Sequence, residues 1–153
     1  MPQVVLVNPQ IPQNTGSIAR TCAATKSPLF IVGKPAFEIS DKTVRRAGLD
    51  YWPYVNLKQY PSWSEYLAEE APENIWLLSK FAKKSYHTAE YGQNDALVFG
   101  SETKGLGKEF LDEYPLEQQL LIPMAEKNVR SLNLSNAVSI VLYESLKQLG
   151  ELS

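Results

Sequence analysis

The sequence predicts an α/β fold in which a mostly parallel sheet is flanked by helices. Three observations point to it: short, continuously apolar runs, helical segments between those runs, and no repeat or linker within 153 residues. Strands that are apolar along their whole length are typical of a parallel sheet covered on both faces. The length suits one ordinary domain, so we expect residues 1–153 to fold as a unit.

Five of the apolar runs are predicted as strands. In chain order they are Val4–Val7, Leu29–Val32, Ile75–Leu78, Ala96–Phe99 and Leu120–Ile122. The intervening helices are predicted over Ser17–Thr25, Asp41–Ala47, Ser62–Glu70 and Lys108–Glu113. Asp41 and Ser62 are suitable N-cap residues, and Ser62 together with Glu65 matches a capping box.

A final helix is predicted over Leu134–Leu149. Its apolar residues recur with a period of 3.6 residues, and Gly150 then provides a C-terminal stop. Strands and helices therefore alternate along most of the chain. This order places ligands at the carboxyl ends of the strands.

Composition limits the classes of function. A formal net charge of −2 argues against a protein that coats nucleic acid through its bulk charge. A local basic face is still compatible with RNA binding, and there are two candidate groups: Lys42, Arg45 and Arg46, and Lys80, Lys83 and Lys84. An ordinary solvated surface explains each group equally well.

The chain has one histidine, His87, and one cysteine, Cys22. This count excludes an all-protein His/Cys zinc site, so no metal is expected. His87 lies in a polar stretch without a nucleophile elbow, and we expect it at the surface rather than in a hydrolase triad. A lone cysteine, no run of the ~18–20 apolar residues that a membrane helix needs, and no signal peptide in MPQVVLV together favour a cytoplasmic protein without a membrane partner.

Three segments rich in Gly, Pro, Asn and Ser each follow a predicted strand. They are Asn8–Arg20, Phe99–Gly107 and Ile122–Val138. Because the carboxyl ends of parallel strands meet at one edge of a sheet, these segments are expected to converge on one pocket. Simple connectors would explain the glycines and prolines, but explain less well the functional side chains among them: Asn14, Arg20, Glu102, Arg130, Asn133 and Asn136.

Together the segments resemble the three motifs of the SPOUT methyltransferases. The strings that carry the resemblance are NPQIPQNTGSIARTCAAT, RRAGLDYW, LVFGSETKGLG and IPM…RSLNLSNAVSIVLYESLKQLG, and the likeness runs from Val4 to Gly150. In spacing and brevity the chain looks most like the minimal tRNA (cytidine/uridine-34)-2′-O-methyltransferases, the TrmL/YibK group. The resemblance implies a C-terminal deep trefoil knot, a homodimer, and S-adenosyl-L-methionine as cofactor.

Matched position by position, the resemblance also implies a cofactor site. Its residues would be Leu78, Ser79, Gly100, Ile122, Met124, Ser131, Leu132 and Asn133. Apolar side chains suit the faces of an adenine, loop amides suit its edge, and Gly100 permits close approach of the backbone. Core packing would explain Leu78 and Ile122 equally well, and helix capping would explain Ser131.

Arg20 matches the catalytic arginine of the family. Methylation of a ribose 2′-hydroxyl requires that oxygen to be oriented and to lose its proton. Family proposals make the arginine the general base. A guanidinium, however, keeps its proton throughout the physiological pH range, so it is better suited to binding a phosphate and stabilising the charge of an alkoxide. Both roles stay open, as does a salt-bridged surface arginine.

A second group of residues is expected to support the site or to bind RNA: Asn14, Arg45, Arg46, Glu102, Arg130, Asn136 and Tyr143. Glu102 is expected to tie its segment to backbone amides or to an arginine. Arg45 and Arg46 would contact phosphates, which give affinity without base identity. Tyr143 either touches RNA or packs on its helix. Ordinary packing explains Tyr51, Trp52 and Tyr54 better than the alternative that one of them stacks on anticodon-loop bases.

The implied function is methylation of wobble nucleotide 34, a cytidine or carboxymethylaminomethyluridine, bound through the anticodon stem-loop of leucine tRNAs. The first alternative is 2′-O-methylation at another tRNA or rRNA position. The second is a non-catalytic SPOUT-like RNA-binding or assembly protein. Two departures from the family pattern affect loops only: the spacing from Met124 to Arg130 is one residue longer, and Gly107 replaces a proline.

Overall fold

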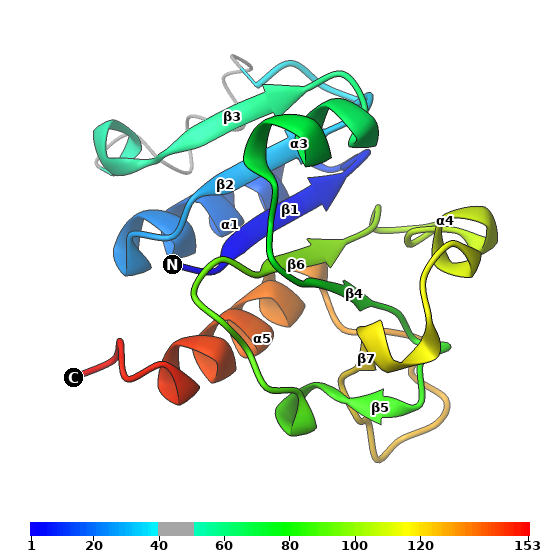
Figure 1. Ribbon diagram of the computed structural model, residues 1–153. Helices are drawn as coiled ribbons and strands as arrows, with labels where there is room; N and C mark the ends of the chain where they lie inside the picture. The colour runs from blue at the N-terminus through cyan, green and yellow to red at the C-terminus, as the bar shows by residue number, and fades with distance from the viewer. Residues whose placement is uncertain (40–50) are drawn as a thin grey trace.

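The computed structural model of the chain describes residues 1–39 and 51–153. The predicted helix Asp41–Ala47, with Arg45 and Arg46, therefore lies outside the described residues. Seven strands form one sheet of order β3-β2-β1-β6-β4-β7-β5, and all neighbouring pairs are parallel (Figure 1). The strands are β1 (Gln3–Val7), β2 (Leu29–Val32), β3 (Leu57–Tyr60), β4 (Ile75–Leu78), β5 (Lys84–Ser85), β6 (Ala96–Phe99) and β7 (Gln119–Leu121).

Helices cover both faces of the sheet. α1 (Pro12–Thr25) and α5 (Leu134–Gln148) pack side by side on one face, and α3 (Trp63–Glu70) and α4 (Lys108–Asp112) lie on the other (Figure 1). Single-turn helices occur at Trp52–Tyr54, Tyr86–Thr88 and Leu116–Gln118. Within the described residues, no helix is long and apolar enough to cross a membrane.

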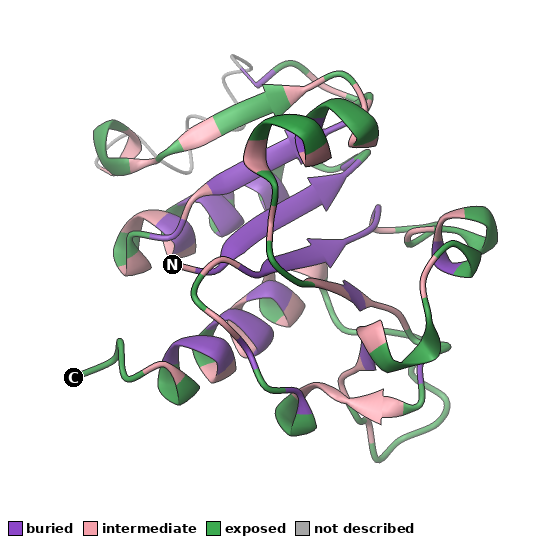
Figure 2. Cartoon of the chain, viewed as in Figure 1, coloured by how far each residue is buried: buried purple, intermediate pink, exposed green. Residues whose placement is uncertain are grey.

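The central strands are buried on both faces (Figure 2). In β1, Val4 and Leu6 belong to the core beneath α1 and α5, whereas Val5 and Val7 belong to the core beneath α3 and α4. Successive side chains of a strand point to opposite faces, so a sheet covered on both sides requires apolar residues at every position. The continuous apolar runs predicted this arrangement, and the prediction is confirmed.

Two strands have no counterpart among the predictions. β3 lies at the edge of the sheet and exposes Lys58 and Gln59, so it lacks an apolar run. β5 is only two residues long and forms the opposite edge. Edge strands bury less surface, and their sequences carry a correspondingly weaker signal.

The first helix begins at Pro12, not at the predicted Ser17. Proline suits the first helical turn because its missing N–H would have had no partner there. Asn14, Thr15 and Gly16 are buried inside α1, so most of the first Gly/Pro-rich segment is helix, not loop. The predicted cap of α3 is confirmed, since Ser62 Oγ accepts the Glu65 amide at 3.2 Å.

Candidate functional site

A cavity of about 340 Å³ opens at the carboxyl edge of the sheet. Its lining includes the ends of three neighbouring parallel strands: Leu78 at the end of β4, Phe99 at the end of β6, and Ile122 directly after β7. Residues 130–132, which lead into α5, complete the wall. The volume falls in the range of ~300–1,000 Å³ that is typical of small-molecule sites.

The structure gathers most of the predicted cofactor residues in this cavity. The lining includes Leu78, Ser79, Gly100, Ile122, Met124, Ser131 and Leu132, together with Glu102 and Arg130. Asn133 is not part of the lining: it is the N-cap of α5, and its Oδ1 accepts the Ser135 amide at 2.9 Å. Residues far apart in the sequence thus meet at one edge of the sheet, as their positions after strands predicted.

Glycines shape the loop that follows β6. A Cβ built on Gly100 would lie 2.0 Å from the carbonyl carbon of Gly105, a distance that no side chain tolerates. The two strands of this hairpin-like loop are joined by Ser101 and Gly105, whose backbone groups bond reciprocally at 3.2 and 3.0 Å. Gly105 has φ +62°, which favours glycine. Because glycines occupy these positions, this part of the cavity wall is formed by backbone atoms instead of side chains.

Glu102 ties this loop to the start of α1. Its carboxylate accepts the amides of Gln10 and Ile11, each at 2.8 Å. Ile11 is the N-cap of α1 and offers no side-chain acceptor, so the carboxylate satisfies amides that the helix leaves unpaired. This is the tie to backbone amides that the sequence predicted, rather than the arginine partner.

A chain of amides continues the connection to the third segment. Asn14 donates from Nδ2 to Glu102 at 3.2 Å, and Asn133 donates from its own Nδ2 to Asn14 Oδ1 at 3.2 Å. Asn14 is buried, and Asn133 caps α5. One residue from each of the three segments therefore belongs to a single hydrogen-bonded chain.

Arg20 lies in a second depression, between α1 and α5. This depression is lined by Ser17, Arg20, Thr21, Tyr51, Ser135, Asn136 and Ser139. The guanidinium carbon of Arg20 is 5.6 Å from the centroid of the Tyr51 ring, and the Tyr51 hydroxyl donates to the Gly16 carbonyl at 2.9 Å. Burial raises the pKa of Tyr51 from its ordinary value, although the charge of Arg20 acts in the opposite direction.

The first turns of α5 face both sites. Leu134 and Ala137 line the cavity, whereas Ser135 and Asn136 line the depression with Arg20. Within one chain, Arg20 and Asn136 therefore do not reach the cavity lining that contains the predicted cofactor residues. The expectation of a single pocket holds for the second and third segments, whereas the first segment, Asn8–Arg20, contributes no residue to the cavity lining and is connected to it only through Asn14 and Glu102.

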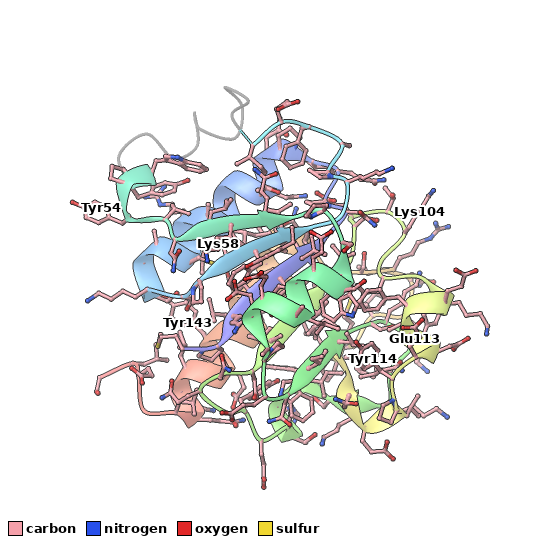
Figure 3. The ribbon with its side chains drawn as sticks, turned by 45° about the horizontal axis from the view of Figure 1, so that its top comes forward. Tyr54, Lys58, Lys104, Glu113, Tyr114 and Tyr143 are labelled. Carbon is pink, nitrogen blue, oxygen red and sulfur yellow. The ribbon has the colours of Figure 1, made fainter. Side chains whose placement is uncertain are left out.

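Tyr143 is 44% exposed on α5 (Figure 3). It stands two turns after Ser135 and one turn after Ser139, which both line the depression. Residues four apart share one face of a helix, so Tyr143 extends the same row of side chains away from Arg20. Its side chain is thus accessible at the surface, and its contact with RNA stays a prediction.

Sequence reasoning did not place Phe81 at the site, and it treated Lys80 only as part of a basic group. Both line the cavity, and Phe81 is 72% exposed. Their position directly after a strand was an available signal. Across residues 1–39 and 51–153, no group of three or more His, Cys, Asp or Glu side chains is arranged to hold a metal ion.

Comparisons with known proteins identify the family. Residues 1–143 match the SpoU rRNA Methylase family. The tRNA (cytidine(34)-2′-O)-methyltransferase of Saccharophagus degradans is 44% identical to this chain, over 96% of it and 95% of the relative. A solved structure from a study of the 2-OH methylation of C/U34 on tRNA superposes with a TM-score of 0.90 and 40% identity, covering 98% and 97% of the two chains.

A third comparison concerns the cofactor. The SpoU methyltransferase AviRb from Streptomyces viridochromogenes, solved in complex with the cofactor AdoMet, superposes with a TM-score of 0.82 and 25% identity. The match covers 97% of this chain and 60% of AviRb. The family match and the 44% identical relative both extend along nearly the whole sequence, and the chain therefore belongs to the SpoU rRNA methylase family.

Proposed function

We propose that this chain is an S-adenosyl-L-methionine-dependent tRNA 2′-O-methyltransferase that acts on the ribose of nucleotide 34. The observation that carries the proposal is the convergence of the loops after β4, β6 and β7 on one cavity, to which the start of α1 is tied through Glu102, Asn14 and Asn133. The relatives named for methylation at tRNA position 34 support the substrate. We further propose that residues 1–153 form one catalytic domain.

The cavity fits the proposed cofactor in size and chemistry. Leu78, Ile122 and Leu132 offer apolar surface for the faces of an adenine, and the loop around Gly100 offers backbone groups for its edge. Ser79, Met124 and Ser131 complete the proposed contacts, and Asn133 is linked to the loop through Asn14 and Glu102. When bound there, the cofactor supplies an electrophilic methyl group.

Arg20 is the proposed catalytic residue. Its exposed guanidinium carries a fixed positive charge and is steadied by the ring of Tyr51. We propose that it binds a phosphate next to the target ribose and stabilises negative charge on the 2′-oxygen as the proton leaves. Asn136 and Tyr143 flank the same face of α5 and would contact the RNA. Arg130, at the cavity, is a second candidate for a phosphate contact.

The two separate sites support a homodimer. A target ribose must meet both the methyl donor and Arg20, yet in one chain these groups line different hollows on either side of α5. A second copy, which brings its own Arg20 to the cavity of the first, would complete the site. The exposed apolar side chain of Ile11, at the start of α1, is a candidate for the interface.

Mixed dimers test this arrangement. We would combine an Arg20→Ala chain with a cavity-filling Ser131→Trp chain that has lost cofactor binding. If each site is shared between subunits, a hybrid contains one intact site, and an equal mixture regains roughly a quarter of wild-type activity. Absence of any recovery from a mixture shown to form hybrids would contradict the shared site. Light scattering of the wild-type protein measures the dimer itself.

We also propose the C-terminal deep trefoil knot implied by the resemblance to SPOUT enzymes. The chain from β7 to α5 lines the same cavity as the loops after β4 and β6, and α5 then packs beside α1, as a threaded segment would. General folding rules make knots very rare, so this part of the proposal depends on the family. A crystal structure traced without a break through residues 119–134 checks it.

The finer substrate is a leucine tRNA in the cytoplasm, with cytidine or carboxymethylaminomethyluridine at position 34. The test is methylation of purified tRNA with labelled cofactor, followed by mapping of the labelled nucleotide, together with nucleoside analysis of tRNA from a deletion strain. We expect the 2′-O-methyl mark at position 34 to disappear in that strain. Loss of a different 2′-O-methyl mark would favour another RNA position. A folded protein that binds no cofactor in calorimetry would favour the non-catalytic alternative.

A further inference from the structure

Phe81 is an exposed aromatic residue at the cavity. It lies in the loop after β4, is 72% exposed, and is part of the cavity lining. Its neighbour Ala82 is buried at 5% exposure, so the chain returns to the core immediately after the ring. An aromatic ring that faces solvent beside a ligand cavity is suited to contact a molecule that binds at that cavity.

The backbone of this loop fixes the outward position of the ring. The Ser79 amide donates to the Leu120 carbonyl at 2.9 Å and so continues the pairing of β4 with β7. Ser79 then holds the turn twice: its Oγ accepts the Phe81 amide at 3.1 Å, and its carbonyl accepts the Ala82 amide at 3.2 Å. The exposure of Phe81 is therefore built into a tight turn.

Positive charge surrounds the ring. The ammonium of Lys80 lies 5.2 Å from the centroid of the Phe81 ring, so it covers one face and leaves the other face open to solvent. Lys104 also lines the cavity and projects outward from the loop between β6 and α4 (Figure 3), whereas Lys108 in the same lining is ion-paired with Asp112 at 2.6 Å. In a chain of net charge −2, these lysines make the mouth of the cavity locally basic.

This combination matches the chemistry of single-stranded RNA. Unpaired bases stack on aromatic rings, while lysines neutralise the neighbouring phosphates. The ribose that receives the methyl group must enter the mouth of the cavity, and its own base is joined to that ribose by one bond. The base of the target nucleotide is therefore the RNA group that must lie within reach of Phe81.

We propose that Phe81 is a positioning residue that stacks on the base of nucleotide 34, while Lys80 holds an adjacent phosphate; this rests on the proposed function. Stacking accepts any base because every base has a π-face. Phe81 would thereby orient the ribose without selecting between cytidine and uridine.

The test is a double-mutant cycle between the protein and the RNA. Phe81→Ala, Phe81→Trp and wild-type protein would each bind two anticodon stem-loops, one normal and one abasic at position 34, with affinity read by fluorescence anisotropy. We expect Phe81→Ala to weaken binding of the normal RNA roughly 5- to 100-fold, and to have little effect on the abasic RNA. Phe81→Trp should bind the normal RNA like the wild type, because it keeps an aromatic face.

Two further variants separate charge from stacking. Lys80→Gln should weaken the binding of both RNAs equally. It should also reduce the salt dependence of binding by about the amount expected for one phosphate contact. Leu116→Ala is the matched control, because Leu116 is 50% exposed in the single-turn helix before β7, away from the cavity lining. It should change neither affinity nor salt dependence.

Three results would overturn the stacking role. They are an equal effect of Phe81→Ala on both RNAs, a loss of cofactor affinity in calorimetry, and dissociation of the dimer by the same substitution. Single-turnover methylation of the normal stem-loop by the wild type tests the proposed function separately. If the wild type shows that turnover, but Phe81→Ala changes the affinities for the normal and the abasic stem-loop equally, the stacking role alone fails.

Discussion

The side chain of Arg20 is exposed, charged, and in contact with an aromatic ring rather than with the core. Removing such a group costs the fold little, because it buries almost no apolar surface and leaves no buried partner unpaired. The contribution of Arg20 depends instead on the ligand that binds beside it. A residue of this kind can be changed to measure its chemistry separately from its structural contribution.

We expect Arg20→Ala to keep its melting temperature and cofactor affinity but to lose about 100-fold or more in the rate of methylation, because fixed charge at the reacting oxygen is lost. Arg20→Lys should recover little, since a lysine cannot form the two parallel hydrogen bonds of a guanidinium. Ser17→Ala, in the same depression, is the control. Near-normal turnover in Arg20→Ala would remove this residue from the mechanism.

Cys22 gives a second prediction at this scale. Its thiol is buried in α1, and burial raises its pKa to about 12. Because the thiolate is the reactive form, the native protein should resist thiol reagents at about pH 8 and react fully only in concentrated guanidinium chloride. An engineered Ala24→Cys, at an exposed position of the same helix outside the depression, should react at once in native buffer, with Cys22 in the same protein as the internal comparison. Rapid labelling of native Cys22 would show that α1 opens readily.

Among the secondary-structure elements, α1 is unusual because its N-terminal cap comes from another part of the chain. Glu102 accepts two amides at the start of the helix from a loop about 90 residues away, and Asn14 and Asn133 extend the connection to the start of α5. The helices and the cavity wall are thus fixed relative to one another by polar contacts. The same contacts should stabilise the fold and hold the proposed cofactor site in shape.

Glu102→Gln keeps the shape of this side chain but removes its charge. We expect a loss of about 1–2 kcal/mol in the free energy of unfolding, because hydrogen bonds to a charged group at a helix N-terminus become neutral ones. Cofactor affinity should fall as well, since weaker hydrogen bonds then anchor the loop that contains Gly100. Urea unfolding and calorimetry measure the two effects. Glu90→Gln, at an exposed position outside the helices, is the matched control, and an equal loss in both variants would argue against a capping role.

At the scale of the whole molecule, the second face of the sheet is held by aromatic side chains. Tyr66 stacks against Trp63, and Trp63 Nε1 donates to the Tyr114 hydroxyl at 2.8 Å, so that α3 is joined to the end of α4. The Tyr60 hydroxyl donates to Glu70, and the Tyr66 hydroxyl donates to Gln3. This layer lies on the opposite face of the sheet from α1 and α5, and its contribution is to stability.

The tyrosines of this layer predict how stability depends on pH. The hydrogen bond to Glu70, with burial and nearby carboxylates, raises the pKa of Tyr60 to about 12, and burial followed by the charge of Glu70 raises the pKa of Tyr66 further. The fold therefore favours the protonated phenols. Their contribution is complete below the unfolded pKa of about 10, and it is lost as pH rises through the folded values.

Urea unfolding from about pH 8 to pH 11.5 measures this loss. We expect the wild type to lose stability above about pH 10, and Tyr66→Phe to lose less over the same range because it has no phenol to ionise. Tyr54→Phe, which changes a tyrosine that is 76% exposed, should follow the wild type. A Tyr66→Phe variant with the same slope as the wild type would show that ionisation of Tyr66 is not coupled to folding.

The sequence by itself determined the strands that are buried on both faces of the sheet. β1, β2, β4, β6 and β7 were predicted within about one residue because most are apolar on both faces, and burial on both faces is a local property of the sequence. The position of two segments after parallel strands predicted that they meet at one edge of the sheet, whereas the individual cavity residues were predicted from the resemblance to the SPOUT methyltransferases. Their individual roles stay predictions.

Only the tertiary structure decided features that depend on partners distant in the chain. The edge strand β3 pairs through its backbone, which any sequence provides, and Glu102 finds its amide partners about 90 residues away. The solvent-facing ring of Phe81 and the separation of Arg20 from the cavity by α5 also follow from packing. The local sequence pattern indicates which residues are buried and whether they repeat with the period of a helix or a strand. The position of one loop against another is set by long-range contacts that no local pattern contains.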